Sequence, residues 1–213
     1  MIELLKKIPV DLGQGAVADL TEGKQIAKRL VPDGRNRSAL DVGARNGTQS
    51  QWLKTRGYTV RSIDVEPRFE SCELVNANEP LPFDTDSFDL IWCSEVIEHL
   101  VEPKESLQEM LRVCKPGGRI ILTTPNSYMW LFRMLKLVGL PPERLQRADH
   151  LHFFKLSGFQ SLYPRAEIFG YFPYLGKKWT IKSNWMLDWL TPTFVMCIDL
   201  PKTDAPTSEK KVI

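Results

Sequence analysis

Residues 39–47, which read ALDVGARNG, constrain the fold of this chain more than any other segment. A short apolar run enters a turn that contains Gly43 and Gly47, and a second apolar run ends at the carboxylate of Asp64. A strand that leads through a glycine-containing turn into a helix, followed by a strand that ends in an acid, is typical of a parallel sheet that binds a nucleoside. The pattern therefore predicts an α/β fold with a site for an adenosine-type cofactor.

The turn lacks the glycines of a dinucleotide-binding fingerprint. Arg45 and Thr48 stand where that fingerprint needs glycine, so that a pyrophosphate can approach the helix N-terminus. A nicotinamide-dependent dehydrogenase is therefore disfavoured. Asp41 can instead anchor the turn, while Gly43 and Gly47 let the backbone approach a ligand closely.

Two later segments complete a series of motifs in a fixed order. They are SFDLIW at residues 87–92 and the turn KPGG at residues 115–118. With these segments, residues 36–155 resemble the class I S-adenosylmethionine-dependent methyltransferases, in the small-molecule branch that includes the ubiquinone-biosynthesis O-methyltransferases. The resemblance implies S-adenosylmethionine as cofactor. It also implies a Rossmann-like, seven-stranded, mostly parallel sheet with a C-terminal antiparallel hairpin and helices on both faces.

The hydrophobic pattern alternates between helix and strand as an α/β domain requires. Helical spacing is carried by Leu20, Ile26, Ala27 and Leu30, and again by Leu107, Met110, Leu111 and Cys114 before Pro116. Strands are expected at residues 38–43, 59–64, 72–76, 88–94 and 119–124, and a closing hairpin at 166–174 and 192–200. We expect one methyltransferase domain over residues 1–202, with an acceptor-covering insertion at about 126–150 and a flexible tail at 203–213.

Composition limits the function classes. A chain of 213 residues can bury a sizeable core, and a net charge of +2 gives no reason to expect DNA binding and makes RNA a less favoured partner. The absence of a signal-like segment and of a membrane-length apolar stretch favours a cytoplasmic protein without a transmembrane segment. The four cysteines lack metal-type spacing and are expected to be reduced and mostly buried. Nothing in the sequence indicates an oligomeric state.

The resemblance implies a role for individual residues around the cofactor. Asp64 would accept hydrogen bonds from both ribose hydroxyls, and a helix cap before Pro67 is the alternative. Asn76, where the family usually has Asp, and Ala77 would hold the adenine. The complete expected cofactor set also includes the glycine turn and the end of the fourth strand: Asp41, Gly43, Ala44, Arg45, Gly47, Asp64, Val65, Asn76, Ala77, Ser94 and Glu95.

Arg45 is the largest departure from the family pattern, which commonly has Gly there. A side chain at this place could crowd the methionine moiety or force the backbone from its preferred dihedral angles. The guanidinium could also point outward or reach the cofactor carboxylate. The sequence does not choose between these interpretations.

The chain has three histidines, and all of them border the expected acceptor site. A sulfonium methyl group is already activated, so transfer depends mainly on in-line positioning, and a hydroxyl acceptor also benefits from a general base. His99, His150 and His152 are the candidate catalytic residues, and ordinary hydrogen-bonded loop histidines are the alternative.

Glu95, Glu98 and His99 follow helical spacing, and His150 could join them. Oxygen and imidazole ligands in this arrangement could hold Mg²⁺ or Mn²⁺. The small-RNA 3′-end 2′-O-methyltransferases and the ubiquinone O-methyltransferases, both of which the chain resembles, use such a cluster. The same Glu-His signature also occurs in family members without metal, so we treat the metal site as a candidate.

Residues 128–140 are rich in aromatic side chains and methionine and occupy the place where the family inserts substrate-covering elements. They suit an apolar acceptor or a peripheral membrane contact, with Arg133 and Lys136 facing water, or they simply pack on the sheet. Trp185, Met186 and Trp189 could form a second wall of the same pocket or an edge of the core.

Three hypotheses result. The first is methyl transfer to a hydroxyl or other nucleophile of a small-molecule, lipid, quinone or glycan acceptor. The second is a metal-assisted RNA 2′-O-methyltransferase, which rests only on Glu95, Glu98, His99 and His150. The third is a noncatalytic cofactor-binding module, in which Arg45 and Asn76 mark an eroded site. The acceptor itself cannot be inferred, because fold and cofactor do not determine it.

Overall fold

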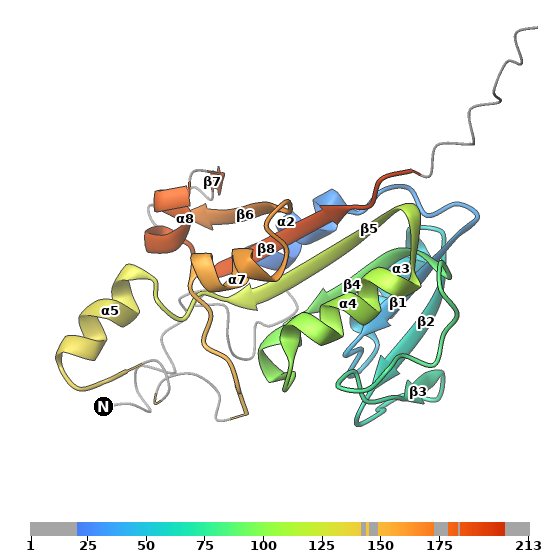
Figure 1. Ribbon diagram of the computed structural model, residues 1–213, viewed down its shortest axis with the longest axis horizontal. Helices are drawn as coiled ribbons and strands as arrows, with labels where there is room; N and C mark the ends of the chain where they lie inside the picture. Colours follow the sequence, from blue (N-terminus) through green and yellow to red (C-terminus); the bar gives the residue numbers. More distant parts are fainter. Residues whose placement is uncertain (1–20, 142–143, 145–148, 173–178, 183, 203–213) are drawn as a thin grey trace, which may run out of the picture.

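The computed structural model describes residues 21–141, 144, 149–172, 179–182 and 184–202. The expectations for Leu20, for part of the 126–150 insertion and for the tail at 203–213 lie outside the described residues. The described chain forms one mixed sheet with helices on both sides, shown in Figure 1.

Eight strands form the sheet, in the order β3-β2-β1-β4-β5-β8-β6-β7. The first five in this order pair in parallel, and β8 is antiparallel to both β5 and β6. The strands are β1 (Arg37–Val42), β2 (Tyr58–Asp64), β3 (Cys72–Leu74), β4 (Phe88–Ser94), β5 (Cys114–Pro125), β6 (Glu167–Phe172), β7 (Trp179–Ile181) and β8 (Thr193–Asp199). The expected Rossmann-like fold and its hairpin of β6 and β8 are confirmed.

Three details differ from expectation. The sheet has one more strand than the seven expected, because β7 adds to the edge of β6. The helix expected to run to Pro116 ends at Val113, and Cys114 already pairs with Phe88 as the start of β5. Strand β5 is therefore longer than the expected 119–124, since the backbone at residues 115–118 continues it.

The helices begin where local chemistry favours them. Thr21 caps α2 (Glu22–Leu30) by accepting from the amide of Lys24, and Gly47 precedes α3 (Thr48–Thr55) with a φ of +78°. Pro103 opens α4 (Pro103–Val113), where a missing amide proton costs nothing. The C-terminal half adds α5 (Trp130–Leu137), α7 (Leu156–Leu162) and α8 (Asn184–Leu190).

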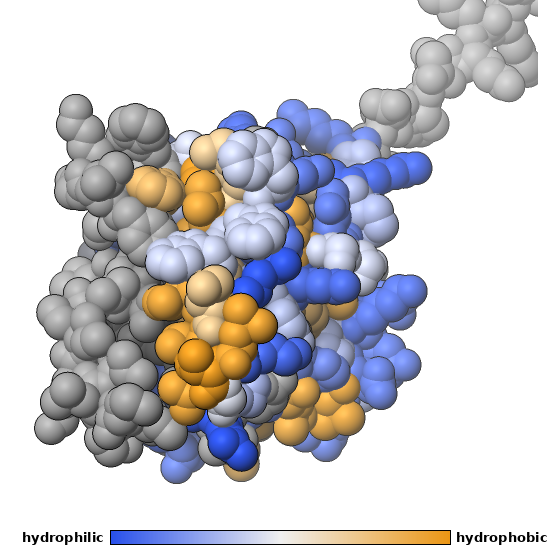
Figure 2. Space-filling model, turned by 90° about the vertical axis from the view of Figure 1, so that its left-hand side faces the viewer, coloured by the Kyte–Doolittle hydropathy of each residue, from blue (hydrophilic) through white to orange (hydrophobic). Residues whose placement is uncertain are grey.

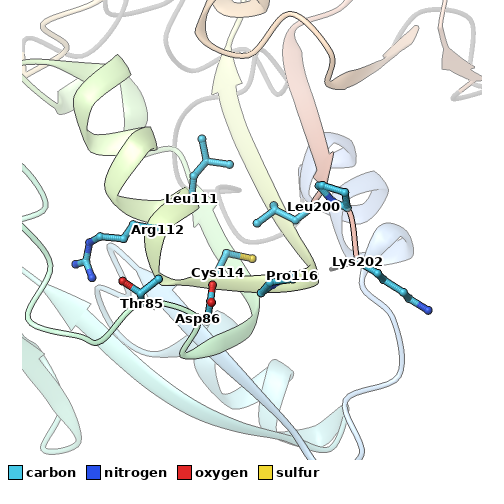
Figure 3. Close-up of a pocket in the computed structure, with 9 residues that line it drawn as sticks. Thr85, Asp86, Leu111, Arg112, Cys114, Pro116, Leu200 and Lys202 are labelled. Carbon is cyan, nitrogen blue, oxygen red and sulfur yellow. The ribbon is translucent and has the colours of Figure 1, made fainter. Parts of the chain in front are cut away.

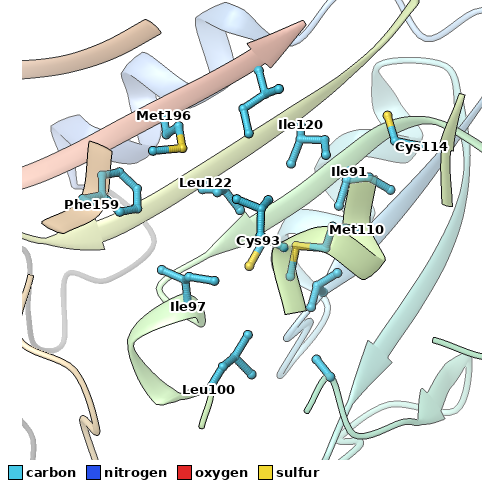
Figure 4. Close-up of a cluster of buried hydrophobic side chains, with 14 of the residues drawn as sticks. Ile91, Cys93, Ile97, Leu100, Met110, Cys114, Ile120, Leu122, Phe159 and Met196 are labelled. Carbon is cyan, nitrogen blue, oxygen red and sulfur yellow. The ribbon is translucent and has the colours of Figure 1, made fainter. Parts of the chain in front are cut away.

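The two faces of the sheet carry two separate cores. Successive strand residues point to opposite faces, so Leu40 packs with α4 and α7 whereas Ala39 packs with α2 and α3. Figure 4 shows the first of these cores, in which Cys93 from β4 lies near Met110 from α4, and Phe159 from α7 lies on the side of Met196. Helices therefore cover both faces, as expected.

Helix α5 stands apart from this core at one end of the molecule (Figure 1). Of its residues only Phe132 is buried. The interpretation in which residues 128–140 simply pack on the sheet is therefore wrong for most of this helix. Among the described residues, no helix combines the length and the apolar character needed to cross a membrane.

Candidate active site

The strand order reverses between β1 and β4, and the expected site residues lie at the carboxyl edge of these strands. In open α/β sheets the crevice outside this edge, at the reversal point, is where ligands bind. Val42 is in register with Cys93 of β4 and with Ile63 of β2, so the turn after β1, Asp64 and Ser94 meet at one edge. Topology thus brings together three of the expected cofactor segments.

The turn after β1 wraps around the end of β2. The amides of Gly43 and Ala44 both donate to the carbonyl of Ile63, at 2.9 and 3.1 Å, and the amide of Arg45 donates to Asp64 Oδ2 at 2.9 Å. The second oxygen, Asp64 Oδ1, accepts from the amide of Glu66 at 2.8 Å. Asp64 therefore holds the turn in place while remaining partly exposed.

Arg45 adopts the left-handed region with a φ of +49°, and its side chain is exposed. Only glycine enters this region without a steric cost, and this accounts for the Gly that the family pattern has at this position. The structure therefore favours the interpretation in which Arg45 strains the backbone and points outward.

Both glycines of the turn lie under hydrophobic side chains. Gly43 has a φ of +72°, and a Cβ there would lie 2.2 Å from Val96 Cγ2. Gly47 has a φ of +78°, and a Cβ there would lie 3.0 Å from the ring of Phe69. The two positions thus need glycine for conformation and for packing, and Val96 and Phe69 form hydrophobic walls beside the turn.

Asp41 lies beneath the turn, with only 1% of its surface exposed. Its Oδ2 accepts a hydrogen bond from the Ser50 hydroxyl of α3, and Ser62 donates to Ser50 at 2.8 Å. Burial raises the pKa of the Asp41 carboxyl to about 7, against the opposing effects of the Ser50 hydrogen bond and the nearby charge of Lys24. Asp41 thus connects β1 to α3 below the site.

The expected adenine residues occupy the loop after β3. Asn76 Oδ1 accepts from both the amide and the side-chain nitrogen of Asn78, at 3.1 and 3.0 Å, and Ala77 is buried. Since a carbonyl oxygen has two lone pairs, an adenine amino group would have to displace the Asn78 side chain from this oxygen. Val65, also in the expected set, is 63% exposed directly after Asp64.

Ser94 ends β4 beside a threonine of β5, and Glu95 follows it. The hydroxyls of Ser94 and Thr123 lie 2.8 Å apart, and Thr123 donates to Glu95 Oε1 at 3.0 Å. Glu95 has a φ of +58°, and the segment that follows it forms a short 3₁₀ helix, η1 (Ile97–His99). The α-helical spacing assumed for Glu95, Glu98 and His99 is therefore not present.

Three of the four candidate metal ligands nevertheless come together. One potential ligand atom from each of Glu98, His99 and His150 lies within 4.8 Å of the others, and Glu95 is not part of this group. The rings of His99 and His150 meet edge to face with centroids 4.7 Å apart. Glu98 is buried and accepts from the Thr124 hydroxyl at 3.2 Å.

The backbone around residue 149 determines the tautomer of His99. Its Nδ1 lies 2.8 Å from the carbonyl oxygen of Asp149. A carbonyl can only accept, so Nδ1 carries the proton and Nε2 of the neutral ring keeps its lone pair. The Asp149 carboxylate lies 3.7 Å from the same Nδ1.

His152 lies apart from this cluster. Its Nε2 is 3.2 Å from the carbonyl of Val101, and its ring stacks on Phe154. The loop itself is held by amides of Leu151 and His152, which both donate to the carbonyl of Glu98. His152 therefore has the contacts of a structural loop histidine.

Sequence reasoning missed several polar residues that organise the site. Thr123 and Thr124 connect the end of β4 to Glu95 and Glu98, and Ser50 and Ser62 hold Asp41. The sequence did contain an indication of the two threonines. They are adjacent near the end of an otherwise apolar strand, and buried hydroxyls need hydrogen-bond partners.

A pocket at the opposite edge of the sheet is not the expected site. It lies where β5 begins and β8 ends, as Figure 3 shows. Its lining residues include Asp86, Leu111, Arg112, Cys114, Leu200 and Lys202. Arg112 is already bound there by Glu109 and by the carbonyls of Leu81 and Phe83. The expected cofactor site is at the carboxyl edge, where the strand reversal and Asp64 lie.

Comparison with known proteins agrees with this geometry. Residues 40–122 match the family described as a methyltransferase domain. This range contains the glycine turn, Asp64, the adenine loop and the Glu98–His99 pair. Over these residues the chain is similar to the methyltransferase domain family, and its fold is one that S-adenosylmethionine-dependent methyltransferases also have.

Individual relatives match over part of their length. The chain is 38% identical over 95 residues to a demethylmenaquinone methyltransferase of Clavibacter sepedonicus, which covers 39% of each chain. It is 31% identical over 133 residues to a ubiquinone biosynthesis O-methyltransferase of Xylella fastidiosa, with 54% of this chain and 51% of the relative covered. The chain thus spans about half or less of the length of these relatives.

A solved structure shows the same fold over most of the chain. A methyltransferase from Archaeoglobus fulgidus that depends on S-adenosylmethionine superimposes with a TM-score of 0.61, at 16% identity, over 83% of this chain and 94% of the other.

Proposed function

We propose that this chain transfers the methyl group of S-adenosylmethionine to a hydroxyl of a small-molecule acceptor, with a quinone, another lipid or a glycan as the candidate classes. The observation that carries the proposal is the position of the Glu98, His99 and His150 cluster. It follows the end of β4 directly, beside the edge where the glycine turn and Asp64 meet.

The residues at this edge suit a sulfonium nucleoside. Each oxygen of Asp64 accepts one backbone amide and retains a lone pair, so the carboxylate can still accept both ribose hydroxyls. Val96 and Phe69 offer apolar surface beside the turn, and Ala77 with the backbone of its loop would border the adenine. Ser94 and Glu95 would border the methionine end.

The chemistry asks the protein mainly for positioning and for one proton acceptor. When bound, the cofactor supplies a methyl group already activated by the positive sulfur. Nε2 of His99 would take the acceptor's hydroxyl proton as the oxygen attacks in line, and the Asp149 carbonyl and carboxylate would stabilise the resulting imidazolium. His150 packs against His99 and would fix its ring.

A second role for the same cluster is supported by its ligand set. A carboxylate and two imidazoles within 4.8 Å suit a divalent cation. The hydrogen bond from His99 Nδ1 to a backbone carbonyl is the outer-shell contact that metal-bound histidines usually make. A bound cation would lower the pKa of the acceptor hydroxyl in place of a histidine base. The similarity to a ubiquinone biosynthesis O-methyltransferase supports an oxygen acceptor in either case.

Calorimetric titration with S-adenosylhomocysteine tests the cofactor site. We expect Asp64→Ala to weaken binding on the order of 10- to 100-fold, because two hydrogen bonds to a charged group are lost. Asp84→Ala, in the exposed loop before β4, is the matched control and should bind as the wild type does. No binding by the wild type at millimolar ligand would refute the proposal, whereas binding without transfer to any hydroxyl acceptor would favour a noncatalytic module.

Metal removal separates the two roles of the cluster. If a cation takes part, exhaustive chelation abolishes transfer, Mg²⁺ or Mn²⁺ restores it, and His150→Ala lowers the affinity for the metal. If His99 acts as a base, chelation changes nothing and His99→Gln lowers kcat.

A further inference from the structure

Helices α5 and α8 present apolar side chains to solvent on one side of the molecule. Met134, Leu137 and Val138 are 56%, 79% and 71% exposed, and Trp185 and Trp189 of α8 are 67% and 48% exposed. We call these five residues the apolar patch. Figure 2 shows apolar side chains gathered on this side, where α5 faces the viewer. Large exposed apolar residues that cluster in this way mark interaction surfaces.

The two helices hold the patch together through one contact network. Arg133 of α5 pairs with Asp188 of α8 at 2.6 Å, and its guanidinium lies over the ring of Trp189 at 4.8 Å from the centroid. Met134, Leu137 and Val138 follow the i, i+3, i+4 spacing and lie on one side of α5 and of the residue after it. Phe132, on another side of the helix, is buried. The exposed stripe is therefore a second apolar face of a helix that is already anchored.

The charge around the patch indicates the chemistry of its partner. Lys136 is exposed on α5 itself, and Arg144, also exposed, reaches the carbonyl of Gly139 next to Val138. Asp188, an acid of α8 that faces α5, is already paired with Arg133.

Apolar and tryptophan side chains bordered by basic residues are the combination that lies in the interface of an anionic bilayer. A nucleic acid partner would use the basic residues and would leave Leu137 and Val138 without apolar contacts. A second copy of this chain would bring its own Lys136 and Arg144 against the same face, which costs free energy by like-charge repulsion.

We propose that the apolar patch is a docking surface for an anionic lipid bilayer, with Met134, Leu137 and Val138 inserted between the headgroups and Lys136 and Arg144 at the phosphate level. This inference does not depend on methyl transfer, because it rests on a surface outside the carboxyl edge of the sheet. It would place the segment that connects β5 to His150 at the membrane surface.

Vesicle co-sedimentation without cofactor or acceptor tests the proposal. We expect the protein to bind vesicles of phosphatidylcholine and phosphatidylglycerol and to bind pure phosphatidylcholine at least about tenfold more weakly. Replacing Met134, Leu137 and Val138 together by Ser should lower binding to the anionic vesicles at least about tenfold, because inserted apolar surface is lost. Lys136→Glu with Arg144→Glu should do the same and abolish the dependence on salt.

Leu74→Ser is the matched control, since Leu74 is 73% exposed on β3 and lies outside the patch. It should bind vesicles as the wild type does, and circular dichroism should show that all variants are folded. Absence of binding to anionic vesicles would overturn the proposal. So would a dimer in sedimentation that the triple Ser variant dissociates, or binding to single-stranded RNA in place of vesicles.

Discussion

Arg45 carries a conformational cost, because its backbone is in the left-handed region. A left-handed backbone costs an L-residue about 1–2 kcal/mol, and glycine avoids this while losing somewhat more entropy on folding. We therefore expect Arg45→Gly to raise the free energy of unfolding by about 1 kcal/mol, measured by urea denaturation.

Asn36 provides the comparison for this effect, because its φ is +59° and asparagine tolerates this region better than arginine does. Asn36→Gly should change stability by no more than a few tenths of a kcal/mol. A loss of stability in Arg45→Gly would mean that the guanidinium makes a stabilising contact and that this contact outweighs the backbone strain.

The buried carboxyl of Asp41 makes stability depend on pH. Its pKa in the fold is about 7, above its ordinary value, so between about pH 4 and 7 the folded state holds a proton that the unfolded state has released. The contribution of Asp41 to the free energy of unfolding is thus fully present below about pH 4 and is lost as the pH rises toward 7. Wild-type stability should fall over this range by an amount on the order of a few kcal/mol.

Asp41→Asn cannot ionise and should lack this slope, so the variant gains stability relative to the wild type as the pH rises. Urea denaturation at intervals between pH 4.5 and 8 measures the difference. Asp33→Asn, at an exposed pair with Arg35, should stay close to parallel with the wild type. Parallel curves for Asp41→Asn and the wild type would show that the carboxyl is ionised throughout.

At the scale of residues, the sequence predicts where a residue lies along a strand better than it predicts which side chains that residue contacts. The apolar run that ends at Asp64 predicts the end of β2 correctly, and the resemblance implies that His150 lies near His99, as it does. The burial of Asp41 and the hydrogen bonds of Asn76 could not be predicted, because they depend on the partners Ser50 and Asn78 and on which side-chain conformations leave room for them.

At the scale of elements, the parallel strands were predictable and the pieces between them were less so. Strands β1 and β4 are mostly buried and largely apolar, with turn residues nearby, and these signals are local. The end of α4 was not predicted, since Cys114 fits the helical spacing equally well and only its pairing with Phe88 decides the matter. Strand β7 has three residues, and its pairing with β6 alone makes it a strand.

Asp188 makes contacts that connect three helices, α5, α7 and α8. Its Oδ2 binds Arg133 of α5 at 2.6 Å, its Oδ1 accepts the amide of Leu156 at the start of α7 at 3.3 Å, and its own helix is α8. Removing a partly exposed pair of this kind costs about 1 kcal/mol. In Asp188→Ala we expect the amides of α5 to exchange hydrogen about fivefold faster, with the strands unchanged.

The pair of Arg119 with Asp199 is the control, because it lies at the far end of β8. Asp199→Ala should leave the exchange of α5 unchanged. A uniform acceleration across β1, β4 and β5 in Asp188→Ala would show that Asp188 supports the whole domain, and the local tie proposed for it would then be wrong.

At the scale of the whole molecule, the two cores share one sheet and should unfold together. Each central strand contributes to both, as Leu90 and Ile91 of β4 do on opposite faces. If α4 or α2 unfolds, it exposes apolar residues of the central strands. The same strands, through their hydrogen bonds, also hold the residues that pack on the other face. A single cooperative transition is therefore expected for the described domain.

The four cysteines allow this cooperativity to be measured. All are free and buried, as expected from the sequence, and burial raises the pKa of each thiol, to about 12 for Cys114 and about 11 for Cys197. Cys93 and Cys114 belong to the core with α4, and Cys197 belongs to the core with α2. Cys72 lies on the three-residue strand β3 and is 9% exposed.

In low urea we expect a thiol reagent to modify Cys93, Cys114 and Cys197 with one shared free energy of opening, equal to that of global unfolding, because these thiols react only after the sheet opens. Cys72 should react faster, since loss of the short edge strand β3 exposes it. Mass spectrometry of labelled peptides assigns each thiol, and Cys72→Ser removes the fast phase as a control. Faster labelling of Cys197 than of Cys93 would show that the two faces open separately, which contradicts a single cooperative sheet.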